Sequence, residues 1–207
     1  MRPVALAAVL VVTVASAASI AQDRMPPIPA DRLSDAQKQA IVDFKAARSA
    51  DVSGPFIPML RSPEVMSRAR ALGDYLRFRS TLPPRSSEFV ILLIARQWTQ
   101  QYEWNAHEPL ARQAGVSAAT ITAIAEGRRP APMTDDEDAL YTLVDEIARN
   151  RSVSDATYAR AVERFGEAGV IDTLGIAGYY TMLSMIMNTA RTPVPGGGAH
   201  QLAPLPR

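Results

Sequence analysis

The segment that most constrains the fold is residues 89–95, an unbroken apolar run with the sequence FVILLIA. Pro83 and Pro84 stand just before it, and Ser86 or Ser87 can cap a helix that contains it. A helix that is apolar on nearly every side has no face suited to water, so other elements must enclose it. We therefore predict that this run forms a helix that is buried on most faces.

Helical periodicity extends through most of the remaining chain. Apolar residues recur three or four positions apart, and Ser34 with Gln37 and Thr134 with Glu137 form capping boxes at two helix starts. No segment alternates convincingly between apolar and polar residues, and no repeat of solenoid length is present. A chain of 207 residues is long enough for one core, so we predict a single all-α domain.

Proline-rich segments divide the chain. We predict a linker and one helix over residues 22–49, the main helical domain over residues 50–190, and a disordered tail over residues 191–207. Residues 53–58 are predicted to form a loop because they are rich in proline and glycine. The next helix, from Pro63, is predicted to direct a set of apolar side chains inward. These are Val65, Met66, Ala69, Leu72, Leu76 and Phe78.

Two helices are predicted near the end of the chain. Ser154 caps the first, and the second runs from Glu167 or Gly169 to about Thr189. Residues 170–187 are apolar enough to raise the question of a membrane span. Their small and polar residues are more typical of close helix packing, so we favour a core helix.

Residues 1–21 resemble a secretion signal. Arg2 supplies a positive start, residues 4–14 form an apolar core and small residues follow, so we predict cleavage after Ala21. An uncleaved anchor is the alternative, but the apolar run is too short to span a bilayer comfortably. We therefore expect a secreted or periplasmic protein without stable membrane insertion.

The chain contains no cysteine. Export to an oxidising compartment would therefore bring no disulfide bonds, and thiol catalysis and thiolate metal sites are excluded. The formal net charge of +1 gives no reason to expect nucleic acid as a partner.

One cluster of reactive side chains surrounds the central run. Glu103 and His107 are four residues apart and share one face of a helix, and Glu88 stands at the start of the apolar run. Imidazole titrates near neutrality, so His107 is the candidate for proton transfer, with Glu103 as its partner or as a second acid or base. Glu88 in apolar surroundings is a candidate proton donor. The alternative is that Glu103 and His107 form an ordinary pair on a helix surface.

Three neighbouring residues are candidates for contact with a small-molecule substrate. Arg96 could bind a substrate carboxylate, although an ion pair within the protein would serve equally. Tyr102 and Trp104 could form an aromatic platform or belong to the core or to an interface. Metal binding by the two carboxylates and the imidazole is conceivable, but a second histidine and the usual ligand spacing are missing. We therefore predict no metal site.

The cluster resembles the motif of a known family. Glu88, eleven intervening residues, the sequence QQYE from Gln100 to Glu103, three more residues and then His107 are similar to the carboxymuconolactone decarboxylase/AhpD-like family. In its alkylhydroperoxidase branch the motif contains Cys-x-x-Cys, and Gln100 and Glu103 occupy those two cysteine positions here. Gln100 is therefore a fourth candidate for substrate contact. The resemblance covers roughly residues 50–190.

The resemblance implies an all-helical, AhpD-like bundle that assembles into trimers or hexamers, with the active site near subunit contacts. The peroxidase and disulfide-reductase chemistry of the thiol branch cannot operate without cysteine, so a peroxiredoxin label would have no chemical support. The decarboxylase branch uses neither metal nor organic cofactor and acts on a lactone that carries a carboxylate. Loss of carbon dioxide there leaves a dienolate, and an imidazole with a carboxylic acid is suited to stabilising and protonating it.

Three functions remain open from the sequence. The first is a cofactor-free lyase or isomerase acting on a small carboxylated lactone or keto acid, with His107, Glu103 and Glu88 as catalytic residues. An export signal would separate this protein from the cytoplasmic pathway of aromatic degradation, which leaves the substrate open. The second is a non-catalytic exported protein that binds a small hydrophobic acid, and the third is a metal-dependent enzyme.

Overall fold

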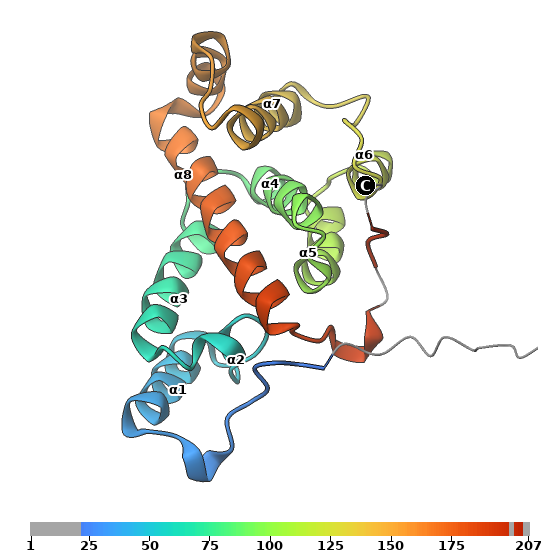
Figure 1. Ribbon diagram of the computed structural model, residues 1–207. Coiled ribbons are helices and arrows are strands. Elements are labelled where there is room, and N and C mark those ends of the chain that lie inside the picture. Colours follow the sequence, from blue (N-terminus) through green and yellow to red (C-terminus); the bar gives the residue numbers. More distant parts are fainter. Residues whose placement is uncertain (1–21, 199–200, 205–207) are drawn as a thin grey trace, which may run out of the picture.

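The computed structural model describes residues 22–198 and 201–204, and within them every regular element is a helix (Figure 1). The predicted all-α fold is therefore confirmed. The predicted signal segment, residues 1–21, and His200 in the tail lie outside the described residues. In chain order the elements are η1 (Ala30–Arg32), α1 (Asp35–Arg48), α2 (Phe56–Met59), α3 (Pro63–Phe78), α4 (Pro84–Gln97), α5 (Gln101–Gln113), α6 (Ala118–Ala125), α7 (Asp135–Asn150), α8 (Asp155–Ala190) and η2 (Pro195–Gly197).

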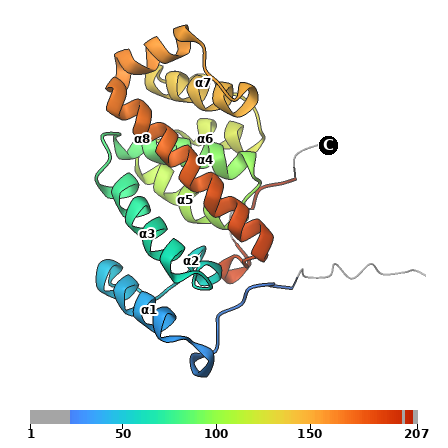
Figure 2. The same ribbon diagram turned by 60° about the vertical axis from the view of Figure 1, so that its left-hand side comes forward.

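Helix α4 is the centre of the fold, and its apolar run is buried as predicted. Every residue from 89 to 95 is at most 7% exposed. The helix contacts α5, α6, α7 and α8. Figure 1 and Figure 2 show α8 crossing α4 on one side while α5 and α6 lie on the other. The apolar run is thus removed from water on all sides, which is the main source of stability for such a segment.

Polar caps fix the starts of several helices. Ser34 and Thr134 form both predicted capping boxes, in which side chain and backbone exchange hydrogen bonds. Helix α4 differs from the prediction because it begins at Pro84, with Pro83 at the cap position and no side-chain cap. The fixed φ of proline suits a first helical position, so the two serines predicted as caps lie inside the helix instead.

Helix α8 combines the two helices predicted after Ser154. Gly166 has φ 67° and ψ 170°, which interrupts the helical geometry between them. By length and composition, α8 is the one helix within the described residues that could cross a membrane, yet 56% of its most apolar window is buried inside the fold. Its contacts with α3, α4 and α7 are those of an internal helix.

Two local predictions are wrong. Residues 53–58 are not only a loop, because Phe56–Met59 forms the short helix α2. On α3, Val65, Leu72 and Phe78 are 46%, 46% and 68% exposed rather than turned inward. The buried face of α3 is narrower than expected, because the helix contacts its neighbours along one side only. That face consists of Met66, Ala69, Gly73 and Leu76.

The C-terminal tail differs from the prediction of disorder where the structure describes it. Leu202 is 3% exposed. Its backbone N–H donates to Gln101 Oε1 at 2.8 Å, and Gln101 Nε2 donates to its carbonyl at 2.7 Å. Arg96 Nη1 donates to the carbonyl of Ala203 at 2.7 Å. Residues 201–204 are therefore tied to the junction between α4 and α5.

Candidate active site

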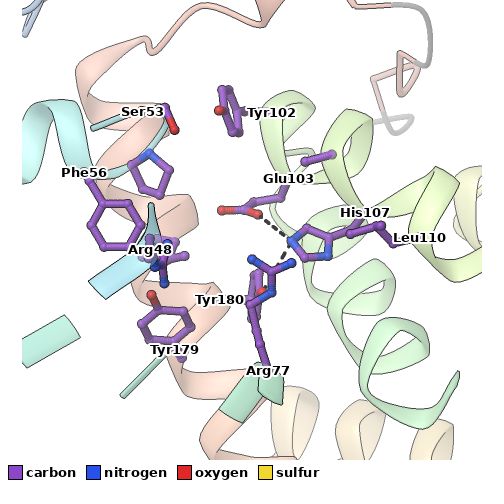
Figure 3. A pocket seen from close by; sticks show the side chains of 13 residues that line it. Arg48, Ser53, Phe56, Arg77, Tyr102, Glu103, His107, Leu110, Tyr179 and Tyr180 are labelled. Carbon is purple, nitrogen blue, oxygen red and sulfur yellow. Dashed lines mark hydrogen bonds and ion pairs between the residues drawn. The ribbon is translucent and has the colours of Figure 1, made fainter. Parts of the chain in front are cut away.

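One face of helix α5 lines a cavity of about 180 Å³ (Figure 3). A cavity of about 150 Å³ can hold a benzene-sized molecule, so this one has room for a small ligand. Residues from α1, α2, α3, α8 and the loop before α2 complete the lining. The residues that α5 contributes are Tyr102, Glu103, Ala106, His107 and Leu110.

His107 is buried and contacts three polar side chains. It is 4% exposed, and its Nδ1 lies 2.7 Å from Glu88 Oε2. A carboxylate accepts hydrogen bonds, so Glu88 holds the ring with Nδ1 as the donor. The other nitrogen, Nε2, lies 3.3 Å from the hydroxyl of Tyr180 and 3.5 Å from Glu103 Oε2. Glu88 on α4 thus orients the imidazole through Nδ1, and Nε2 faces two possible proton partners, Tyr180 and Glu103.

Glu103 is enclosed rather than solvated. It is 3% exposed, and its Oε1 has no hydrogen-bond partner among the described residues. Burial raises the pKa of the Glu103 carboxyl, and the charge of Glu88 adds to the rise, while His107 and Arg77 oppose it. The protonated form is therefore favoured more than in water, which suits a proton donor. The alternative of a solvent-exposed pair between Glu103 and His107 is wrong.

Two tyrosines of α8 form another wall of the cavity. Burial raises the pKa of Tyr179 to about 12 and that of Tyr180 well above its usual value. Both phenols are therefore neutral at physiological pH and can donate hydrogen bonds. The ring of Tyr180 meets the ring of His107 edge to face, with centroids 5.1 Å apart. Tyr180 consequently limits how the imidazole can turn.

Two arginines also line the cavity (Figure 3). Arg48, at the end of α1, pairs with Asp74 at 2.8 Å and lies over the ring of Phe56 at 4.7 Å. Arg77, near the end of α3, forms no ion pair within residues 22–198 and 201–204. The cavity therefore contains both the proton-transferring cluster around His107 and two cationic side chains.

Of the predicted aromatic contacts, only one lies at this cavity. Tyr102 lines it, and partial burial raises the pKa of its phenol. Trp104 is 3% exposed and belongs to the hydrophobic core, so its prediction as a substrate contact is wrong. Because the two residues are two positions apart on α5, their side chains point in different directions.

Gln100 and Arg96 have structural roles instead of the predicted substrate contacts. The side chain of Gln100 accepts from the backbone N–H groups of Tyr102 and Glu103, which makes it the N-cap of α5. Its amide also donates to Asn188 Oδ1 at 3.0 Å. Arg96 lines a different cavity, beside α6 and α7, and its guanidinium binds backbone carbonyls, including that of Ala125.

The sequence pattern does not indicate Arg48, Arg77, Tyr179 or Tyr180 as one group. They come from three helices that lie far from His107 along the chain, and only the packing of α1, α3 and α8 brings them to α5. Among the residues that the structure describes, no group of three or more His, Cys, Asp or Glu side chains is placed to hold a metal ion.

Comparisons with known proteins agree with the fold and with the resemblance in the sequence. Residues 63–146 match the model of the carboxymuconolactone decarboxylase family. A crystal structure of an uncharacterized peroxidase-related protein from Ralstonia eutropha JMP134, described as an alkylhydroperoxidase AhpD core, is similar with a TM-score of 0.66 and 14% identity. The similarity covers 84% of this chain and 92% of that one, and at this identity it concerns the fold. No curated protein matches the sequence.

Proposed function

Because residues 63–146 match the carboxymuconolactone decarboxylase family, we propose that this protein is an acid–base enzyme, a lyase or isomerase that needs no organic cofactor. Its substrate is a small carboxylated lactone or keto acid. The observation that carries the proposal is the enclosed position of His107, with Glu88 at 2.7 Å behind it and Glu103 and Tyr180 in front. Buried titratable groups that interact closely in a cavity are typical of functional sites.

The side chains divide the work in a decarboxylation as follows. The bond between the substrate carbon and its carboxylate breaks, carbon dioxide leaves, and the electron pair stays on the substrate as an enolate. Glu103, whose pKa is raised by burial, donates the proton that carbon must receive and is left as a carboxylate. His107 Nε2, at 3.5 Å from that carboxylate, takes up a proton from solvent and passes it to Glu103, which restores both groups. Glu88 keeps the imidazole in one orientation throughout.

Two broader features of the protein belong to the same proposal. The mature chain starts after Ala21 outside the cytoplasm, as residues 1–21 suggest. It forms a trimer or hexamer, and the exposed apolar side chains Val65 and Leu72 of α3 support an interface there.

A variant of His107 tests the proposed activity. Purified protein is incubated with a panel of carboxylated lactones and β-keto acids, and product and carbon dioxide are measured. His107→Ala should lower turnover by about 10²- to 10⁴-fold, the usual contribution of a general acid or base. Circular dichroism of both proteins shows whether the fold is retained.

Equal rates for wild type and His107→Ala across the panel would refute the proposal. A second outcome would distinguish a non-catalytic ligand-binding protein from an enzyme. If wild type binds members of the panel, as shown by a rise in melting temperature, but forms no product over long incubation, the protein is a ligand-binding protein that uses the same cavity.

A further inference from the structure

A second hollow lies next to the candidate active site. It has a volume of about 420 Å³ and is lined by residues from the end of α1 and the end of α3. Arg48 and Arg77 line this outer hollow and also line the inner cavity that contains His107. The two guanidinium groups therefore stand between the outer hollow and the inner cavity.

Arg48 is held in place within the protein. Its guanidinium pairs with Asp74 Oδ1 at 2.8 Å, and the other oxygen of Asp74 binds Arg70 at 2.6 Å. It also lies over the rings of Phe44 and Phe56, at 5.3 Å and 4.7 Å from their centroids. Its charge is offset and its side chain is fixed from several directions.

Arg77 differs because no carboxylate lies within ion-pair distance of it in the described part of the chain. Its charge nevertheless opposes the rise in the pKa values of Glu103, Tyr179 and Tyr180, so its field extends into the inner cavity. An arginine that is uncompensated at the edge of a partly apolar cavity is a strong site for a carboxylate, because guanidinium can donate two parallel hydrogen bonds to it.

We propose that Arg77 is the residue that binds the substrate carboxylate and that anionic substrates enter the inner cavity through the outer hollow beside it. The ligand is a small, flat, unsaturated carboxylate, because rings and an aliphatic side chain form much of the inner lining. These are Phe56, Tyr102, Tyr179, Tyr180 and Leu183. This inference rests on the proposed function only in assuming that the natural ligand is a carboxylate.

The position of Arg77 also selects which carboxylate it holds. An ion pair stabilises a carboxylate in the ground state and so opposes its loss as carbon dioxide. A carboxylate bound by Arg77 is therefore one that the substrate keeps, and it holds the reacting carbon near Glu103 and His107, which line the same cavity. The substrate class is thus a carboxylate with a second group at which bond cleavage or proton transfer occurs.

Binding of benzoate, with benzamide as its uncharged counterpart, tests the proposal by titration calorimetry. Arg77→Met should weaken benzoate binding about 10- to 100-fold, as expected for a lost charge-assisted hydrogen bond, and Arg77→Lys should recover part of the affinity. Benzamide should bind both proteins equally. The matched control is Arg79→Met, because Arg79 lines the outer hollow only, and it should change the benzoate affinity by less than about threefold.

Three results would overturn the assignment: no benzoate binding to wild type, unchanged affinity in Arg77→Met, or an equal loss in Arg79→Met. The last would mean that the general positive field of the hollow, and not Arg77 itself, attracts the anion. A protein that shows this Arg77-dependent binding but no turnover would leave the assignment of Arg77 standing while the proposed enzymatic function fails.

Discussion

Replacing Glu103 with methionine should make the protein more stable while it removes the proposed acid. Glu103 is 3% exposed, and its Oε1 has no hydrogen-bond partner among the described residues. A buried polar atom left without a partner costs about 1–3 kcal/mol. Methionine has a similar length and no such atom, so the free energy of unfolding should rise by about the same amount. For a chain of this size the melting temperature should increase by about 2–4 °C for each kcal/mol.

The size of this gain should depend on pH. Burial raises the pKa of Glu103 in the folded protein above its value in the unfolded chain. Below the unfolded pKa the carboxyl is protonated in both states, so its ionisation takes no stability from the folded protein. As the pH rises from the unfolded pKa through the folded pKa, the folded protein holds a proton that the unfolded chain has released, so the free energy of unfolding falls. The advantage of the variant is therefore smallest in acid and grows toward neutral pH.

Guanidinium denaturation of wild type and Glu103→Met at about pH 4, 6 and 8 measures this difference. Glu64→Met is the matched control, because Glu64 is an exposed carboxylate paired with Arg68. Its effect should stay within about 0.5 kcal/mol. If Glu103→Met is less stable than wild type at every pH, the attraction of His107 and Arg77 for the carboxylate outweighs its burial, and the assignment of Glu103 as a protonated acid is refuted.

Two further predictions concern the helices around the cavity. A Cβ at Gly73 would lie 2.3 Å from the Tyr179 hydroxyl, so Gly73→Ala should displace that ring and lower the free energy of unfolding by about 1–3 kcal/mol. Gly178→Ala meets nothing within 4 Å and should instead stabilise α8 by about 0.5–1 kcal/mol, so an equal loss in both variants would contradict the packing argument. Asp172 Oδ2 accepts from the backbone N–H and the hydroxyl of Thr81, at 2.7 Å and 2.9 Å, and Asp172→Ala should destabilise by about 1.5–3 kcal/mol. Denaturant unfolding measures all three, and an unchanged midpoint for Asp172→Ala would show that water replaces these hydrogen bonds.

Local sequence patterns were sufficient for most helices and for one part of the site. Capping residues such as Ser34 and Thr134 act within a single turn, so their pattern carries over directly to the structure. The same holds for Glu103 and His107, whose spacing of four residues places them on one helix face. The direct contact between Glu88 and His107 could not be predicted from spacing, because the two residues lie on different helices.

The two arginines that line the cavity could not be predicted in this way. Arg48 and Arg77 lie on helices whose positions depend on tertiary packing, and no local pattern separates them from the other arginines. The opposite error concerns Gln100 and Arg96. Both are close to His107 in the chain, but a helix start and a buried junction use their polar groups for backbone hydrogen bonds. Proximity in sequence was therefore a poor guide to contact with the cavity.

The hydrogen bonds of Leu202 and Ala203 have a practical consequence for work on this protein. Because Gln101 and Arg96 hold these residues against the junction between α4 and α5, Leu202 and Ala203 support the helix that carries His107. A truncation that removed residues 201–204 would also remove these hydrogen bonds. Protein for enzymology is best produced with this segment retained.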